Sequence, residues 1–269
     1  VDSFEAIPKA FCPLHQAFPK ATTLTTAHIG LQQSMLSQET IPHPVAFTAE
    51  TLQRLCVDAV CPLTGYLPPR ANITEVQEAG RQVWTYTCVI PTAPYAALRL
   101  DNPISDGRVL FWQLVAFGLD GFLNWGFNQW GGIAAMQPIP LLDASTPAAA
   151  PYEQLPYVPE SEWFVSTDNT SDASWLKGDG KVLYYGAEGP IATMRLANMR
   201  DGMDDADYLS MLRTMSPTKA AAALARVSDG QHMDRVCRNP ETVIAAREQV
   251  AESIEQMQPR PGGLNVSIQ

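Results

Sequence analysis

The sequence predicts an α/β protein built on a parallel sheet. Four runs with strand character, residues 22–27, 57–63, 82–89 and 121–127, alternate with helical segments. Within residues 84–130 an aromatic and β-branched run precedes a proline-bearing loop, a helix-length apolar segment and a second strand, the order of a parallel βαβ unit. Polar and aromatic residues gather just after the strands, where α/β folds bind ligands. Four such units are half of an eightfold barrel or the bulk of an open sheet.

The segments between these strands have the features of helices or loops. Residues 4–18 place apolar side chains near helical spacing, although two prolines interrupt them. Thr48 is a suitable N-cap for a short helix over residues 48–56, and a further helix begins at Asn72. Residues 108–117 form an apolar helix that Gly118 closes, whereas residues 29–46 are expected to be loop.

The second half of the chain departs from this alternation. A stretch rich in proline and small residues, 131–160, is followed by a short turn-flanked strand within residues 178–186. Residues 191–211 have helical spacing broken only by Gly202, and this helix is expected to cover the sheet. Two further helices over residues 217–227 and 240–258 each carry a proline at the N-terminal end, and residues 259–269 are expected to form a flexible tail.

Charge and hydropathy exclude two classes of partner. The 269 residues carry a net charge of −10 and contain no run rich in Lys or Arg, which argues against nucleic acids and anionic membranes as ligands. The most apolar window, residues 109–127, contains Gln113, Asp120 and Asn124. A helix followed by a strand therefore explains it better than a membrane span.

Three features bear on cellular location. The chain begins at Val1 with neither Met nor a signal peptide, so we expect that a segment was removed or that the chain is part of a longer product. Glycosylation sequons at Asn72, Asn169 and Asn265 favour a secreted, lumenal or organellar glycoprotein. The five cysteines leave one unpaired if the others form disulfides, and their spacing fits no zinc site, so no metal is expected.

No motif for a phosphate, a dinucleotide or a nucleophilic serine is present, so no cofactor is expected and the catalytic residues stay unassigned. Of the dispersed histidines, only His28 stands at a strand end. Asp101 follows a strand-like run and is a candidate to face a site. The acidic residues Asp204, Asp205 and Asp207 are expected to be solvated partners of arginines on the helix surface.

An aromatic and amide cluster gives the clearest chemical signal. Alternation places Trp84 and Tyr86 on one face of their strand, and Trp125, Asn128 and Trp130 follow the next one. Aromatic rings stack on the C–H faces of sugars while amides and phenols bind hydroxyl groups, which favours a glycan ligand. The alternative is that the tryptophans fill the core, and this is the expectation for Trp84 and Trp112.

Three stretches resemble the catalytic domain of glycoside hydrolase family 123, a group of β-N-acetylgalactosaminidases. They are WTYTC (84–88), LRLDNPISDGRVLFWQLVAFGLDGFLNWGFNQW (98–130) and GDGKVLYYGAEGPIATMRLANMRDGMDDADYL (178–209). The resemblance covers residues 1–215. It implies that these residues are the carboxyl-terminal half of a (β/α)8 TIM-type barrel, with residues 216–258 as a C-terminal helical extension.

The resemblance also implies a mechanism. The acetamido oxygen of the substrate attacks its own anomeric carbon, an Asp orients that group, and a neighbouring Glu protonates the leaving oxygen. In the family this Asp–Glu pair immediately precedes a helix like residues 4–18. The chain opens with Val1-Asp2-Ser3 instead. Asp2 as a relic of the pair, with Ser3 in place of the Glu, is one alternative, and the expectation is that the pair lies upstream of residue 1.

Two hypotheses about function follow. The first is a part of a glycoside hydrolase that acts on N-acetylhexosamine glycans, with a partner chain or an upstream half completing the barrel. The substrate-side wall would then be Tyr86, Trp125, Asn128 and Trp130, with His28 and Asp101 as further candidates. The second is a non-catalytic glycan-binding or structural subunit of an extracellular or organellar assembly.

Overall fold

The computed structural model describes residues 3–26, 31–33, 40–42, 46–88, 90–100, 102–128, 178–184 and 189–257. The helices are α1 Ser3–Ala17, α2 Ala49–Arg54, α3 Arg70–Glu78, α4 Asp106–Phe117, α6 Met194–Met215, α7 Pro217–Leu224 and α8 Pro240–Met257, with a 3-10 turn η1 at Thr64–Tyr66. The strands are β1 Leu24–Thr25, β2 Leu31–Gln33, β3 Thr40–Pro42, β4 Ala59–Val60, β5 Gln82–Thr87, β6 Gly121–Asn124, β7 Leu183–Tyr184 and β8 Ile191–Ala192.

A parallel sheet in the order β1-β4-β5-β6 lies at the centre of the fold. The strand order follows the chain order, so each connection leads to the neighbouring strand. Helices lie in the connections between β4 and β5 and between β5 and β6. The α/β class with a parallel sheet is therefore confirmed.

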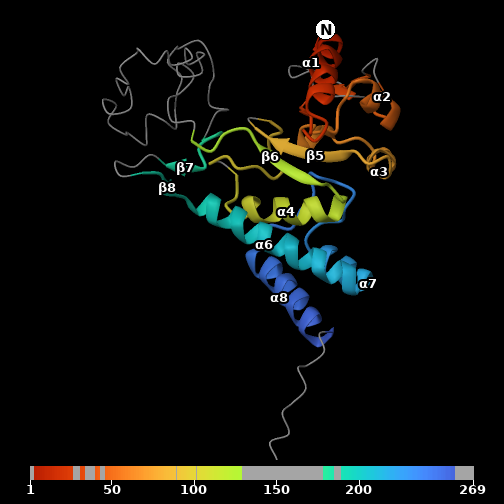
Figure 1. Ribbon diagram of the computed structural model, residues 1–269. Coiled ribbons are helices and arrows are strands. Elements are labelled where there is room, and N and C mark those ends of the chain that lie inside the picture. The colour runs from red at the N-terminus through yellow and green to blue at the C-terminus, as the bar shows by residue number, and fades with distance from the viewer. Residues whose placement is uncertain are drawn as a thin grey trace, which may run out of the picture.

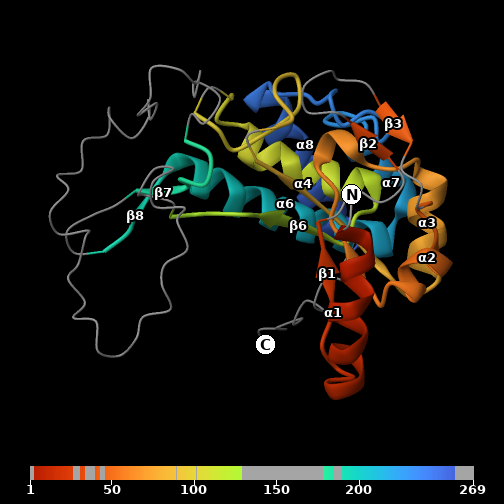
Figure 2. The ribbon, with the colours of Figure 1, turned by 90° about the horizontal axis from the view of Figure 1, so that it is seen from above.

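Helices α4, α6 and α8 form successive layers under the sheet (Figure 1). The α4 helix packs on β6, where the rings of Phe111 and Phe122 meet edge to face at 5.9 Å. The α6 helix packs on the other side of α4, and α7 and α8 pack on α6. In both ribbon views α2 and α3 lie at one end of the molecule and the β7–β8 hairpin at the other (Figures 1 and 2).

One hydrophobic core joins these layers. It includes the fully buried Trp112 and Leu110 of α4, Leu209 and Leu212 of α6, and Val250 of α8. The expectation that Trp112 fills the core is thus confirmed. A second cluster lies between α2, α3 and the first strands, where Leu52, Val57, Ile73 and Val83 are almost completely buried.

Two helix ends have the capping that the sequence predicts. The Thr48 hydroxyl accepts a hydrogen bond from the backbone N–H of Thr51 at the start of α2. Gly118 ends α4 in the left-handed conformation, with φ of 67°, and its N–H bonds to carbonyls of the last turn. The apolar window is a helix followed by a strand, as expected. No helix in the described part of the chain is long and apolar enough to cross a membrane.

Gly202 does not interrupt α6, although glycine at the centre of a helix usually weakens it. It lies where α6 crosses α4, and a Cβ there would stand 2.7 Å from the carbonyl oxygen of Arg108 and 2.8 Å from the ring of Phe111. Gly107 of α4 faces α6 in the same way, with the carbonyl of Arg195 at 3.1 Å from a Cβ position. The two glycines therefore allow a close approach of the helices.

The structure corrects two element boundaries. Residues 31–33 and 40–42, expected to be loop, pair as the antiparallel hairpin β2–β3. These strands are too short to show an alternating pattern. Residues 191–192, expected to open the long helix, pair with β7 as β8, and Thr193 caps α6 by accepting from the N–H of Leu196.

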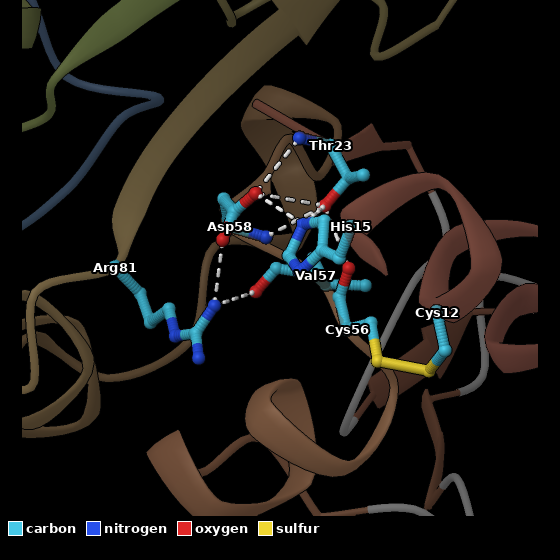
Figure 3. The surroundings of a disulfide bond; sticks show 7 residues. All are labelled: Cys12, His15, Thr23, Cys56, Val57, Asp58 and Arg81. Atoms are coloured by element: carbon cyan, nitrogen blue, oxygen red, sulfur yellow. Dashed lines mark hydrogen bonds and ion pairs between the residues drawn. A yellow bond between two sulfur atoms is a disulfide. The ribbon is translucent and has the colours of Figure 1, made fainter. Parts of the chain in front are cut away.

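The amino-terminal edge of the sheet carries a disulfide between Cys12 of α1 and Cys56, beside a polar cluster (Figure 3). Asp58 accepts hydrogen bonds from His15 at 2.7 Å, from the N–H of Thr23 at 2.9 Å and from Arg81 at 2.7 Å. Burial acts to raise the pKa of Asp58, but the hydrogen bonds from Thr23 and His15 outweigh it and the pKa is lowered. These contacts join α1 to β4 and β5.

Candidate functional site

The two faces of β5 differ in their burial. Val83, Thr85 and Thr87 are buried, and Thr85 pairs with Phe122 on the side that α4 covers. Trp84 and Tyr86 lie together on the opposite, half-buried face, as alternation predicts. The expectation that Trp84 fills the core is wrong, since the residue is only half-buried; its indole lies over Gly121 of β6, where a Cβ would come within 2.6 Å.

Trp125 follows β6 directly and is 36% exposed. Its indole Nε1 donates a hydrogen bond of 2.8 Å to the carboxylate of Asp179, which is distant in the sequence. The turn that carries Asp179 is also joined to the end of β6, since the N–H of Leu183 donates to the carbonyl of Phe127 at 2.8 Å. An aromatic ring and a carboxylate thus meet at the carboxyl edge of the sheet, where parallel α/β folds bind ligands.

Arg195, in the first turn of α6, holds this turn in place. It is 6% exposed, and its guanidinium donates to the carbonyls of Leu98 at 2.6 Å, Gly178 at 3.1 Å and Lys181. Asp179 lies between the last two of these. Gly178 and Gly180 both have positive φ, 68° and 71°, so the turn has the left-handed backbone conformation that glycine adopts without strain.

Asp179 has an unusual acidity. Burial raises its pKa to about 6, although hydrogen bonds from Trp125 and from the backbone of Gly180, with the positive charges of Arg99 and Arg195, act in the other direction. Its carboxyl group therefore changes its protonation state near pH 6. Perturbed carboxyl groups of this kind gather at functional sites more often than elsewhere.

Tyr86 lies among other titratable groups at the end of β5. Burial, followed by the neighbouring Cys88, Cys61 and Tyr66, raises the pKa of Tyr86 to about 12. Burial and Cys88 also raise the pKa of Tyr66, which lies in η1 after β4. Both phenols are therefore neutral at physiological pH and can donate a hydrogen bond.

The other predicted site residues have different outcomes. Asn128 is exposed and follows Phe127, whereas His28, Asp101 and Trp130 lie outside the described residues. Of the predicted binding residues, Tyr86 and Trp125 thus lie at the ends of adjacent strands. Asn72 lies in α3 and its amide donates to the carbonyl of Phe47 at 3.4 Å, while Asn169 and Asn265 lie outside the described part.

Asp179 is the residue that the sequence analysis missed. The Gly-Asp-Gly run was interpreted only as the turn before a strand. An acidic residue between two glycines was an available signal, because such a turn can place a carboxylate at the tip of a tight bend. Its partner Trp125 is 54 residues away, however, and no local pattern connects the two.

The acidic residues of α6 do not behave alike. Asp205 is 1% exposed, so the expectation of a solvated side chain is wrong for it. Its carboxylate accepts from Arg108 at 2.6 and 2.9 Å, from the indole of Trp112 at 2.8 Å and from Arg247 at 3.0 Å. The hydrogen bond to Asp205 is the main reason that the pKa of Arg108 is raised. This cluster joins α4, α6 and α8 and is structural.

Two hollows lie away from Trp125 and Asp179. The larger, about 500 Å³, lies between the η1–α3 segment and residues 230–234, and Tyr95 and His232 are among its lining residues. The smaller, about 300 Å³, adjoins α7 and shares Arg70 and Gly230 with it. Among the described residues no group of three or more His, Cys, Asp or Glu side chains is arranged to hold a metal ion.

Comparisons with known proteins show the family of the chain. No curated protein matches the chain. Among solved structures, the chain is similar to a family 123 glycoside hydrolase from Clostridium perfringens studied for glycolipid glycan hydrolysis, with 17% identity and a TM-score of 0.46. That match covers 77% of this chain and 33% of the other, so this chain spans about a third of the length of the hydrolase. The model of the glycoside hydrolase 123 catalytic domain matches residues 38–212, and the chain therefore belongs to glycoside hydrolase family 123.

Proposed function

We propose that the chain is part of a glycoside hydrolase that acts on N-acetylhexosamine-containing glycans, N-acetylgalactosaminides above all. The observation that carries the proposal is the family match over residues 38–212. The Trp125–Asp179 pair at the carboxyl edge of the sheet supports it, because an aromatic ring beside a hydrogen-bonding carboxylate suits a sugar.

The mechanism that we propose is substrate-assisted. The acetamido oxygen of the substrate attacks the anomeric carbon, which forms a cyclic intermediate that water then opens, and an Asp–Glu pair orients the acetamido group and protonates the leaving oxygen. We expect this pair upstream of residue 1, in the half of a (β/α)8 barrel that precedes α1. The parallel sheet in chain order supports this arrangement.

We also propose that the protein acts in a secreted, lumenal or organellar compartment. The Cys12–Cys56 disulfide supports this proposal, because disulfides persist in oxidising environments. The sequons at Asn72, Asn169 and Asn265 point the same way.

The test of the enzymatic proposal is hydrolysis by the longest natural product that contains these residues. We expect it to release para-nitrophenol from the aryl N-acetyl-β-galactosaminide, and we expect the galacto-configured thiazoline to inhibit it because this compound resembles the cyclic intermediate. Replacement of the upstream Glu by Gln should abolish the activity. If a folded product with an intact Asp–Glu pair cleaves no aryl N-acetylhexosaminide, the proposal is wrong.

A non-catalytic glycan-binding subunit is the second candidate. It is favoured by the charges around Asp179: among the described residues, the charged groups that act on its pKa are Arg99 and Arg195, and no second carboxylate acts on it. Ordinary glycoside hydrolysis needs two carboxyl groups. The residues encoded before Val1 separate the candidates: an Asp–Glu pair there favours the enzyme, and its loss favours the binding protein.

A further inference from the structure

The surroundings of Trp125 suggest what its exposed surface does. The indole has a single N–H, and this group is bonded to Asp179 at 2.8 Å. The residue is nevertheless 36% exposed, and with its N–H engaged the indole offers a ligand only carbon. A fixed aromatic surface at a strand end is a platform for the C–H face of a sugar ring.

The carboxylate of Asp179 has capacity for more hydrogen bonds than it receives from Trp125 and Gly180. A carboxylate offers about four lone-pair sites, and these two donors occupy two of them. The nearby arginines act on Asp179 through their charge, while Arg99 also donates to Asn102 at 3.1 and 3.3 Å and Arg195 donates to backbone carbonyls. Asp179 is only half-buried, so its remaining acceptor sites are within reach of a ligand that enters from solvent.

We propose that Asp179 is a substrate-binding residue that acts as one unit with Trp125. The Trp125 ring packs on the C–H face of a sugar, and the Asp179 carboxylate accepts a hydrogen bond from a hydroxyl group at the edge of the same sugar. The identity of the glycan that this pair binds rests on the proposed function. Sugar binding by Trp125 and Asp179 can, however, be measured without hydrolysis.

The strength of sugar binding by Trp125 and Asp179 depends on the ionisation of Asp179. The charged and titratable groups around it are Arg99 from the loop after β5, Arg195 from α6, and Tyr184 of β7, which interacts with Arg195. Because the pKa of Asp179 is raised to about 6, its carboxyl is ionised above that pH and neutral below it. A carboxylate accepts hydrogen bonds more strongly than a carboxylic acid, so sugar binding should strengthen as the pH rises through about 6.

The test is titration of the chain with N-acetylgalactosamine at pH 5 and pH 7.5, followed by NMR or calorimetry. Asp179→Asn keeps an oxygen that accepts from Trp125, so the ring stays in position while the charge is lost. We expect this variant to bind about 10- to 100-fold more weakly at pH 7.5, the usual effect of losing a charged hydrogen bond, and to lose the pH dependence. Trp125→Phe keeps an aromatic ring and should bind more tightly than Trp125→Ala.

Asp229→Asn is the matched control. Asp229 lines the hollow beside α7, whose lining includes neither Trp125 nor Asp179. Hydrogen bonds from Gln231 and His232 lower its pKa to about 2, so its replacement should change neither affinity nor pH profile. The proposal is overturned if wild type binds no sugar, or if Asp179→Asn binds with the same affinity and the same pH profile as wild type. Hydrolysis by the longer product with an unchanged KM in Asp179→Asn would overturn this inference alone. Sugar binding without hydrolysis would overturn the enzymatic function alone.

Discussion

The buried Asp205 and the half-buried Asp179 differ in how their charge is compensated. Asp205 is bonded by the side chains of Arg108, Arg247 and Trp112, which bring two full positive charges into direct contact. The side-chain donor to Asp179 is the neutral indole of Trp125, and the arginines nearby act on it from a distance. Asp205 therefore serves the fold, whereas Asp179 keeps a proton up to an unusually high pH.

Asp205→Ala tests the structural role. The change leaves two guanidinium groups and an indole N–H without their shared acceptor inside the protein, and loss of one member of a buried pair costs about 3–5 kcal/mol. We expect the free energy of unfolding to fall by this amount in urea denaturation. The neighbouring Asp204→Ala is the control, because Asp204 is exposed and its loss should cost less than about 0.5 kcal/mol. Equal losses in the two variants would contradict the assignment.

Asp179→Asn should increase stability at neutral pH. The pKa of Asp179 is raised from 3.8 to about 6, so ionisation is harder in the folded state than in the unfolded one. The resulting loss of stability is absent below pH 3.8, grows between pH 3.8 and about 6, and stays constant above that. At pH 8 we expect the variant to unfold with a free energy higher by on the order of 1–2 kcal/mol, discounted for partial solvent exposure.

Thermal unfolding of both proteins at pH 4 and pH 8 checks this prediction. The stability advantage of Asp179→Asn should shrink at the lower pH, where both side chains are largely uncharged. A variant that is less stable than wild type at pH 8 would show that the carboxylate contributes to the fold.

Local signals predicted some residues and missed others. Thr48 and Gly118 could be predicted as helix caps, because a cap contacts only backbone groups of the helix end beside it. Trp125 was identified as a binding candidate, but Asp179 and the burial of Asp205 were not. Their partners lie 54 and 97 residues away, and only the folded chain brings them together.

At the scale of elements, the α4–α6 crossing depends on the absence of a side chain at Gly202. Gly202→Ala would raise helix propensity by about 1 kcal/mol, yet its Cβ would meet the Arg108 carbonyl at 2.7 Å. Overpacking against backbone outweighs that gain, so we expect a net loss of about 1–3 kcal/mol in the free energy of unfolding. Calorimetry of the thermal transition measures this loss.

Ser210→Ala on the same helix provides the comparison. It also introduces alanine into α6, but without removing a glycine at the crossing, and it should leave stability within about 0.5 kcal/mol. If Gly202→Ala were as stable as Ser210→Ala, the helices would have room to separate and close packing would not explain the glycine.

Long elements were easier to predict than short ones. Helices α4, α6, α7 and α8 match their expected segments to within a few residues, since many periodic positions define them. The hairpins β2–β3 and β7–β8 were missed or misplaced because strands of two or three residues have no period. For the same reason, the sequence pattern assigns residues 191–192 to the start of the following helix.

At the scale of the whole molecule, the Cys12–Cys56 disulfide ties α1 to the segment before β4 across a sequence separation of 44 residues. Closing a loop of this length restricts the unfolded chain by roughly 2–4 kcal/mol. We expect Cys12→Ser/Cys56→Ser to lose that amount in guanidinium denaturation. Cys237→Ser, which removes a free thiol, should lose much less. Wild type in reductant should match the double variant, and a difference between them would contradict the loop-closure account.

Sequence reasoning could not pair these cysteines, because five cysteines with no known spacing allow many combinations. It did predict the parallel α/β sheet, since alternation of strands and helices is a global pattern that survives local errors. The half barrel and the partner that would complete it stay predictions.

The anchoring of one turn by Arg195 has a consequence for motion. The guanidinium binds the carbonyls of Gly178 and Lys181 from the first turn of α6, so the backbone around Asp179 cannot open freely while that helix end stays folded. Hydrogen exchange should therefore report the turn and the beginning of α6 as a single cooperative unit. A sugar that stabilises one would slow exchange in the other, although the two are separated by a hairpin in the chain.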